Sequence, residues 1–282
     1  MILAVASGKG GTGKTTVSMN LARTVGSKVL LLDCDVEEPN IHLFLKGDTI
    51  EKKFVEIAVP EVDEALCDGC GDCGQFCEYN AIVSFGSKPL IFPAMCHGCG
   101  GCKMVCPVNA IGEVGRRIGT VEYIQVGKIT LVQGCMDVGM AMSPPIIREV
   151  KSAIKRDIMA ILDAPPGTSC PVIATLSGAD FVLLVTEPTP FGLHDLKLSV
   201  EMVRELKIPF GVVINRSGSG DDRVNRFCDG EGIPVLAEIP DCMRIAEAYS
   251  RGELIVDALP EYRSHFKALL DSIIKTNNDR EI

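Results

Sequence analysis

Short apolar runs alternate with helix-like segments over most of the chain. Residues 2–6 (ILAVA) and 29–33 (VLLLD) flank a glycine-rich turn and a helix-like stretch, which is typical of a strand–loop–helix–strand unit. From about residue 127 the alternation resumes, with five more apolar runs at 128–134, 157–163, 180–186, 208–215 and 233–239. Helix-like segments lie between them, at roughly 144–156, 171–177, 193–206, 221–230 and 243–250. This pattern predicts an α/β fold, with a mostly parallel sheet and helices on both faces.

One segment, from about residue 58 to 119, breaks this rhythm. It is rich in Cys and Gly and has only short apolar pieces. Its two halves repeat each other, as CDGCGDCGQFCEYNAI and CHGCGGCKMVCPVNAI. We therefore predict a discontinuous α/β domain (1–57 and 120–282) with an inserted, duplicated domain (58–119). Because so few apolar residues make little core, bound metal must supply most of the insert's folding energy.

Near the C-terminus, residues 260–275 carry apolar side chains at helical spacing. These are Phe266, Leu269, Leu270, Ile273 and Ile274. Such a helix either packs on a core or lies on a membrane surface. Its polar face holds Asp271 beside Lys267 and Lys275, which is not basic enough to favour lipid, so docking on the core is the preferred interpretation.

Composition narrows the class of protein. Of 282 residues, 46% are hydrophobic and 23% charged, which is ordinary for a globular chain and excludes disorder as the main state. The net charge of −9 makes nucleic acid and anionic membranes poor general partners. No apolar run approaches the ~20 residues that span a bilayer, and the N-terminus lacks the features of a signal peptide. We therefore expect a cytoplasmic protein that binds neither nucleic acid nor membrane.

Residues 8–15 (GKGGTGKT) fit the phosphate-binding loop G-x-x-x-x-G-K-[ST]. The glycines let backbone N–H groups turn toward phosphate oxygens, and the following helix adds positive potential at its N-terminus. Lys14 is predicted to reach the β- and γ-phosphates, and the Thr15 hydroxyl to bind Mg²⁺. A chance glycine-rich turn is the alternative, but the strand before the loop and the helix after it favour the phosphate site.

The loop also contains Lys9, and with it the sequence resembles the deviant Walker A motif of the MinD/ParA/nitrogenase-iron-protein family of P-loop ATPases. Residues 29–35 (VLLLDCD), followed by Pro39 and Asn40, resemble the second motif of that family, and residues 163–168 (DAPPGT) its switch motif. The resemblance implies a nucleotide-dependent homodimer, in which Lys9 reaches the nucleotide of the partner subunit.

The same resemblance implies roles for single residues. Asp35 would position or activate the attacking water, Asp33 would support the metal and lysine network, and the Gly167 N–H would sense the γ-phosphate. An Asn at a strand end also caps turns, so the adenine contact implied for Asn215 has a structural alternative. Asp33 has one too, as an ordinary carboxylate at the end of a strand. The predicted catalytic residues are Lys9, Lys14, Asp35 and Asp163. The predicted nucleotide contacts are Gly8, Lys9, Gly10, Gly11, Thr12, Gly13, Lys14, Thr15, Thr16, Gly167, Asn215, Pro240 and Asp241. The predicted Mg²⁺ site is Thr15, Asp33 and Asp163.

Eight of the 13 cysteines lie between residues 67 and 106, in two runs with the spacing C-x₂-C-x₂-C-x₃-C. In a chain without an export signal, such clustering indicates metal ligation rather than disulfides. The spacing matches two-cluster bacterial ferredoxins, in which the fourth cysteine of each run ligates the other cluster. One [4Fe–4S] cluster is therefore predicted at Cys67, Cys70, Cys73 and Cys106. The other is predicted at Cys77, Cys96, Cys99 and Cys102. A pair of zinc sites is the alternative, although zinc prefers two separated C-x₂-C pairs.

Two further cysteines stand near the nucleotide motifs. Cys135 follows a predicted strand, and Cys170 lies seven residues after Asp163. In both places the chain resembles the nitrogenase iron protein, which implies a further [4Fe–4S] cluster shared across a dimer. The alternative is that both are ordinary structural thiols. The remaining cysteines, Cys34, Cys228 and Cys242, are expected to be structural.

Together these parts predict a dimeric, Mg²⁺-dependent ATPase that couples an ATP-driven conformational change to low-potential electron transfer through [4Fe–4S] clusters. Its partner would be an unidentified redox protein or apo-protein. An iron–sulfur scaffold or carrier of the Mrp type is the alternative, although the C-terminal C-x₂-C pair of that type is missing here. A positioning ATPase like MinD or ParA would need a membrane helix or a basic DNA-binding face, and neither is evident.

Overall fold

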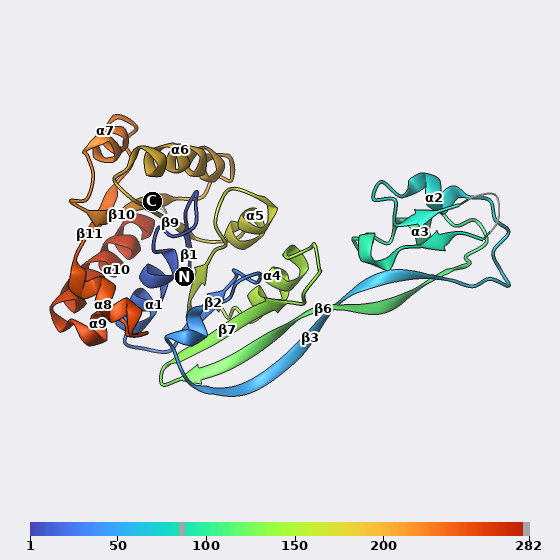
Figure 1. Cartoon of the computed structure of the whole chain (residues 1–282), viewed down its shortest axis with the longest axis horizontal. Helices are drawn as coiled ribbons and strands as arrows, with labels where there is room; N and C mark the ends of the chain where they lie inside the picture. The colour runs from blue at the N-terminus through green and yellow to red at the C-terminus, as the bar shows by residue number, and fades with distance from the viewer. Residues whose placement is uncertain (85–87, 279–282) are drawn as a thin grey trace.

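The structure, a computed structural model, describes residues 1–84 and 88–278. Its body is a nine-stranded sheet in the order β11-β10-β9-β1-β8-β2-β7-β6-β3 (Figure 1). All neighbours from β11 to β7 pair in parallel, whereas β6 and β3 pair antiparallel. The parallel strands are β1 Ile2–Ala6, β2 Val29–Asp33, β7 Ile129–Met136, β8 Met159–Asp163, β9 Phe181–Thr186, β10 Phe210–Ser217 and β11 Val235–Pro240. The predicted mostly parallel sheet is confirmed.

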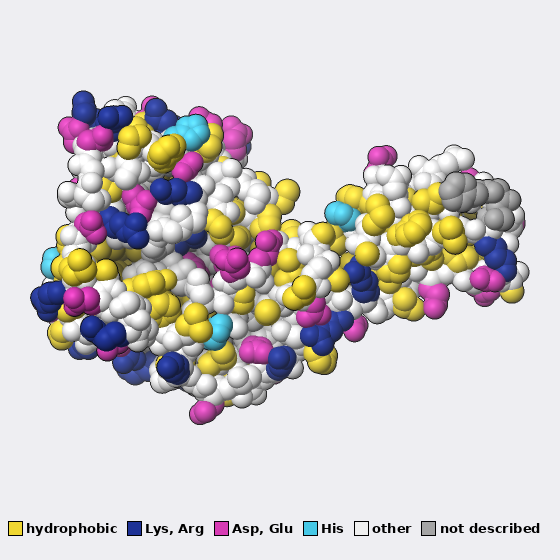
Figure 2. Space-filling view, in the orientation of Figure 1, with side chains coloured by type: hydrophobic (Ala, Val, Ile, Leu, Met, Phe, Trp, Pro, Cys, Tyr) yellow, Lys and Arg dark blue, Asp and Glu magenta, His cyan; other side chains and the backbone are white. Residues whose placement is uncertain are grey.

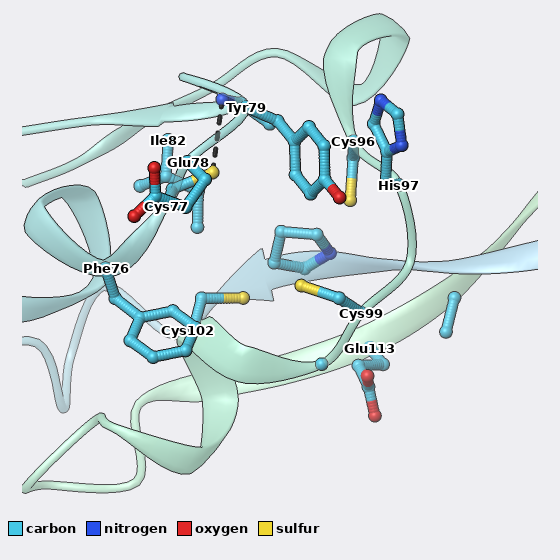
Figure 3. A pocket seen from close by; sticks show the side chains of 14 residues that line it. Phe76, Cys77, Glu78, Tyr79, Ile82, Cys96, His97, Cys99, Cys102 and Glu113 are labelled. Atoms are coloured by element: carbon cyan, nitrogen blue, oxygen red, sulfur yellow. Dashed lines mark hydrogen bonds between the residues drawn. The ribbon is translucent and has the colours of Figure 1, made fainter. Parts of the chain in front are cut away.

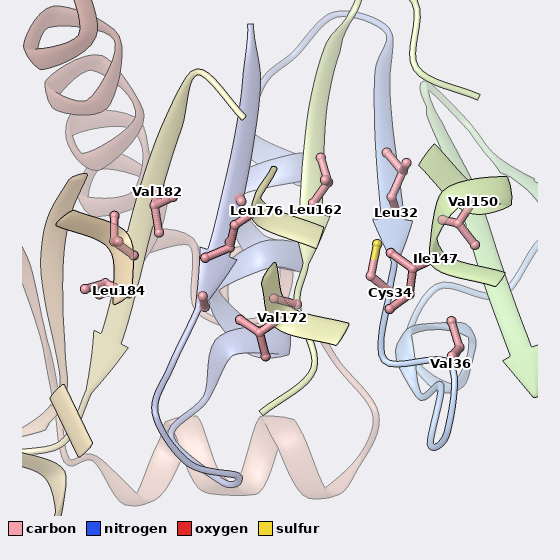
Figure 4. Close-up of a cluster of buried hydrophobic side chains, with 14 of the residues drawn as sticks. Leu32, Cys34, Val36, Ile147, Val150, Leu162, Val172, Leu176, Val182 and Leu184 are labelled. Atoms are coloured by element: carbon pink, nitrogen blue, oxygen red, sulfur yellow. The ribbon is translucent and has the colours of Figure 1, made fainter. Parts of the chain in front are cut away.

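Helices cover both faces of this sheet because its strands are apolar on both sides. One buried layer joins the sheet to α4, α5, α6 and α7, and Figure 4 shows Leu32, Ile147 and Leu176 within it. The second layer packs α1, α9 and α10 on the opposite face. The helices are α1 Lys14–Thr24, α4 Pro144–Lys151, α5 Cys170–Leu176, α6 Pro190–Glu205, α7 Arg223–Gly230, α8 Met243–Ser250, α9 Ile255–Ala258 and α10 Arg263–Asn278, with short 3₁₀ turns at η1 Ile41–Leu43 and η3 Pro260–Tyr262.

The structure tests the predicted end of one helix and the predicted docking of another. The predicted helix 144–156 ends at Lys151, whose Nζ donates hydrogen bonds to the carbonyls of Ala174, Thr175 and Ser177 at the end of α5. The C-terminal helix docks on the core as expected, with Phe266, Leu269, Leu270 and Ile273 buried. Within the described residues, no helix is both long and apolar enough to cross a membrane.

The two long strands β3 (Asp48–Val62) and β6 (Ile111–Val126) were not predicted; the sequence suggested only short apolar pieces here. Residues 119–126 of β6 pair with β7, whereas residues 111–117 pair with β3 alone. The pair thus leaves the body as a two-stranded arm (Figure 1). Cross-strand contacts join β3 to β6, including the Lys52–Glu122 ion pair, where β6 also pairs with β7, and Arg117 over the Phe54 ring.

At the end of this arm lies the cysteine-rich lobe, residues 63–84 and 88–110 (Figure 1). Its elements are short: α2 Asp72–Phe76, β4 Ile82–Val83, β5 Leu90–Ile91, η2 Pro93–Met95 and α3 Gly101–Met104. The small apolar cluster inside the lobe is built around Cys73, Ile82 and Ile111. The side chains partly buried against it are Val62, Cys77, Ile91, Cys102 and Cys106. The predicted domain limits, 57/58 and 119/120, fall within the strands of the arm and stay a prediction.

Candidate functional site

A cleft lies where β1, β2, β8, β10 and β11 end, at the carboxyl edge of the parallel sheet. It encloses about 1300 Å³, including open solvent at its mouth. Ligands of open α/β sheets bind at this edge. The structure gathers here ten of the predicted nucleotide or catalytic residues: Gly10, Gly11, Gly13, Lys14, Thr15, Thr16, Asp35, Asn215, Pro240 and Asp241.

The phosphate loop has the conformation that its glycines allow. Gly13 has φ +93°, and a Cβ there would lie 2.3 Å from the Asn215 Nδ2. The Asn215 side chain donates a hydrogen bond to the Thr12 carbonyl at 2.8 Å, so β10 and the loop are joined. The Thr12 hydroxyl is buried and has no hydrogen-bond partner in the described chain, which fits a loop completed by a bound anion.

Lys14 and Thr15 line the cleft, and the buried Asp163 lies directly behind Thr15. Burial lowers the pKa of Lys14, and the nearby carboxylates of Asp163 and Asp35 partly offset this effect. Asp163 accepts hydrogen bonds from Thr15 Oγ1 at 2.6 Å and from Ser18 Oγ at 2.8 Å. A hydroxyl beside a carboxylate suits Mg²⁺, which prefers oxygen ligands. Sequence reasoning missed Ser18, although it lies one helical turn after Thr15 and therefore on the same face.

Asp33 lies beside Asp163 in the sheet and holds the following loop in place. Its carboxylate accepts hydrogen bonds from the backbone N–H groups of Asp35, Asn40 and Ile41 at 3.1–3.3 Å. Burial, and then the neighbouring Asp163, raises the pKa of Asp33 well above its usual range. These bonds fix the loop that carries Asp35; the role of Asp33 at Mg²⁺ stays a prediction.

Asp35 lines the same cleft as the phosphate loop. Burial raises its pKa to about 6, and the positive charge of Lys14 opposes this shift, whereas Asp163 and Glu38 add to it. A raised carboxyl pKa stabilises the fold at low pH, and this contribution is lost as pH rises through about 6. The ionised Asp35 therefore destabilises the protein in the neutral range.

Asp35→Asn is expected to abolish ATP hydrolysis and to raise the melting temperature of the protein without nucleotide or Mg²⁺ at pH 7.5 by about 2–4 °C. The gain should shrink at pH 4.5, where Asp35 is protonated in the folded state, and vanish below its unfolded-state pKa of about 3.8. Circular dichroism melts at both pH values check this, with Asp48→Asn, at an exposed aspartate of β3, as the matched control. A melting temperature equally raised at both pH values would contradict the assigned cause.

Six predicted site residues do not line the cleft: Thr12, Asp33 and Asp163, described above, and Gly8, Lys9 and Gly167. Gly167 has φ +93°, and its N–H donates to the Ser7 carbonyl at 3.0 Å, so its contact with a γ-phosphate stays a prediction. Gly8 packs against α6, where a Cβ would lie 2.3 Å from the Asp195 carbonyl oxygen. The Lys9 ammonium lies 2.9 Å from the Glu187 carboxylate of its own subunit.

The cleft lining also includes residues that sequence reasoning missed. They are Glu38, Pro166, Arg216, Cys242, Ile245, Ala246, Tyr249 and Ile255. Positions 242, 245, 246 and 249 share one face of α8 and its N-cap, so their helical spacing was an available signal. The mostly apolar side chains of α8 give the cleft a surface suited to a flat base.

The eight clustered cysteines line two separate cavities in the lobe. Cys77, Cys96, Cys99 and Cys102 line one, and Figure 3 shows the sulfur atoms of Cys96, Cys99 and Cys102 directed into it. The other cavity is lined by Cys67, Cys70, Cys73 and Cys106. Each cavity therefore takes three cysteines from one run and the fourth from the other run.

The duplication in the sequence is repeated in the backbone. Asn80 and Asn109 both have a left-handed φ near +50°. Each lies three residues after the fourth cysteine of its run. The next N–H in each half donates to that cysteine: Ala81 to Cys77 Sγ at 3.3 Å, and Ala110 to Cys106 Sγ at 3.2 Å. Such N–H donors stabilise thiolate sulfur. In the described part of the chain, no three Cys, His, Asp or Glu side chains form a site for a single metal ion.

The other cysteines divide by exposure. Cys34 and Cys228 are buried in the main core, and burial raises the pKa of Cys228 to about 11 and that of Cys34 further. Cys135, in β7, and Cys170, at the first residue of α5, are both exposed. Cys242, which was also expected to be structural, is half-buried and lines the cleft. The shared cluster at the exposed Cys135 and Cys170 stays a prediction.

Comparison with known proteins decides the family. The profile described as CbiA, the CobQ/CobB/MinD/ParA nucleotide binding domain, matches residues 3–255. The chain belongs to this family. An uncharacterized protein of Methanocaldococcus jannaschii, MJ0579, is 34% identical over 90% of both chains. The predicted P-loop ATPase family is therefore confirmed.

More distant members of the CobQ/CobB/MinD/ParA family carry functional names. The iron–sulfur cluster carrier protein of Aquifex aeolicus is 27% identical over 92% of this chain, which covers 63% of that protein. The cell division ATPase MinD of Pyrococcus furiosus has a similar fold, with a TM-score of 0.61 and 23% identity over 97% of this chain and 98% of that chain. At that identity the likeness shows the fold alone.

Proposed function

We propose that this family member is an ATP-hydrolysing iron–sulfur protein whose lobe holds two [4Fe–4S] clusters and exchanges electrons under the control of the nucleotide cleft. The observation that carries the proposal is the division of eight cysteines between two cavities, three plus one in each. Ligands of a four-iron cluster each bind a different iron atom, so they stand farther apart than ligands of one ion. When bound, such clusters supply one-electron transfer at low potential.

Within the cleft, the chain's own residues suit ATP hydrolysis with Mg²⁺. Lys14 would neutralise the terminal phosphates, and Thr15 with Asp163 would hold Mg²⁺. Asp35 would orient the attacking water. Its raised pKa favours a proton acceptor near neutral pH.

The arm supports coupling between cleft and lobe. β6 and β7 continue the sheet next to β2, so Asp33 of β2 lies two strands from the arm. Arg116 of β6 donates hydrogen bonds to the Pro93 carbonyl in the lobe and to Met140 Sδ in the body, and Arg117 pairs with Asp137 at 2.9 Å. A movement of the loop after β7 would therefore reach the lobe through these contacts.

The lobe also has a surface suited to a protein partner. Figure 2 shows hydrophobic side chains gathered over it. Its exposed large apolar residues include Leu66, Phe76, Tyr79, Leu90, Phe92, Met95 and Met104. Exposed apolar patches of this kind are typical of docking sites, and an electron donor or acceptor is the proposed partner.

The cluster potentials test the coupling. Saturating Mg²⁺-ATP is expected to shift the midpoint potential of at least one cluster by roughly 60 mV, which corresponds to a tenfold coupling for one electron. Anaerobic redox titration followed by electron paramagnetic resonance measures it, with the Lys14→Gln variant as control. Equal potentials with and without nucleotide would remove the electron-transfer proposal.

A cluster-carrier function is the second candidate, and the names of three distant relatives favour it. The exposed Cys135 and Cys170 would then take the place of the missing C-x₂-C pair. Transfer of a labile cluster to an apo-ferredoxin, lost in Cys135→Ser, would favour the carrier over the electron-transfer protein.

A further inference from the structure

Glu187 joins two cations beside the cleft. It directly follows β9, and its side chain is only 9% exposed. The two carboxylate oxygens contact different partners: Oε2 lies 2.9 Å from Lys9 Nζ, and Oε1 lies 2.8 Å from Arg216 Nη1. A carboxylate as buried as this one holds its partners more firmly than an exposed ion pair does.

Contacts that do not involve Lys9 hold the backbone around Glu187 in place. The Glu187 carbonyl accepts a hydrogen bond from the Thr189 N–H at 2.8 Å. Gly192 packs so closely that a Cβ there would lie 2.2 Å from the same carbonyl oxygen. The Thr186 hydroxyl donates to the Gly192 carbonyl at 3.0 Å. The carboxylate is therefore preorganised, and the flexible Lys9 side chain is the partner that can leave it.

Lys9 does not line the cleft of its own subunit, although Gly10 and Gly11 do. Its ammonium is held instead by Glu187. Arg216 lines the cleft and shares the same carboxylate, with a left-handed φ of +54° that is rare outside glycine. The single negative charge of Glu187 thus attracts both Lys9 and Arg216. Each cation weakens the attraction of Glu187 for the other.

We propose that Glu187 is a positioning residue that retains Lys9 within its own subunit and thereby sets the nucleotide concentration at which two copies of this chain associate. The proposal rests on the proposed function, in which Lys9 reaches the nucleotide of a second copy. The phosphates of that nucleotide must compete with Glu187 for the Lys9 ammonium. Removal of the Glu187 charge therefore lowers the nucleotide concentration needed for association. Removal of Arg216 leaves Glu187 with Lys9 as its single partner in this cluster, so it raises that concentration.

Sedimentation velocity tests this with Mg²⁺ and the β,γ-imido analogue of ATP. Glu187→Gln keeps the shape and removes the charge, and it is expected to lower the analogue concentration for half-maximal dimer roughly tenfold. Glu187→Asp keeps the charge and should return the threshold toward that of the natural protein. Arg216→Gln should raise it; because Arg216 lines the cleft, analogue affinity is measured by calorimetry and dimer formation is compared at equal occupancy.

The outcomes separate the two claims. If Lys9→Ala dimerises as the natural protein does, Lys9 does not reach the partner's nucleotide and that part of the proposed function fails. If Lys9→Ala stays monomeric while Glu187→Gln keeps the natural threshold, only the role of Glu187 is overturned. A Glu187→Gln threshold that is higher at unchanged analogue affinity and melting temperature also overturns it, because Glu187 would then support association.

Discussion

Lys14→Gln is expected to weaken ATP binding roughly 100-fold, or by about 3 kcal/mol, and to abolish hydrolysis. Lys14 is the cation that offsets the carboxylates of Asp163 and Asp35. Without it, the pKa of both carboxyls rises further, and those that remain ionised repel the phosphates. Isothermal titration with Mg²⁺-ATP measures the binding, and phosphate release measures the hydrolysis.

The melting temperature separates this loss from misfolding. Burial lowers the pKa of Lys14, so its charge costs stability in the protein without nucleotide. The neutral Gln side chain should therefore melt no lower than the natural protein. Lys28→Gln, at an exposed lysine before β2, is the matched control and should bind ATP normally. Natural ATP affinity in Lys14→Gln would exclude the phosphate role assigned to this loop.

The parallel sheet could be predicted because its strands are buried on both faces and so appear as continuous apolar runs. The arm could not be predicted in this way. β3 (DTIEKKFVEIAVPEV) is mostly exposed, and its charged residues gain their support from the neighbouring strand, as in the Lys52–Glu122 pair. Only Val55, Ile57 and Val59 of β3 alternate into the main core, so the periodic signal of this 15-residue strand is short.

In the candidate site, too, some residues could be predicted from the sequence and others could not. The phosphate loop and the cysteine runs could be located because local spacing determines which groups turn inward. Glu187 could not be identified, since its contacts with Lys9 and Arg216 join three segments distant in sequence. Ser18 lies between these cases: its helical spacing from Thr15 was visible, but its carboxylate partner, Asp163, is 145 residues away.

The cysteine lobe gives the second large prediction, which concerns iron content after anaerobic purification. The natural protein should hold about eight iron atoms per chain, in two clusters of four. A value near ten would indicate a further cluster shared by two subunits at Cys135 and Cys170. Cys77→Ala with Cys99→Ala removes two ligands from the same cavity, so about half of the iron should remain.

The matched double variant, Cys70→Ala with Cys77→Ala, removes two cysteines of the same run. They line different cavities, so both clusters should be lost and little iron should remain. If this variant instead keeps half of its iron while Cys77→Ala with Cys99→Ala loses nearly all, each run holds its own cluster. Two zinc ions per chain with no acid-labile sulfide would exclude iron–sulfur clusters altogether.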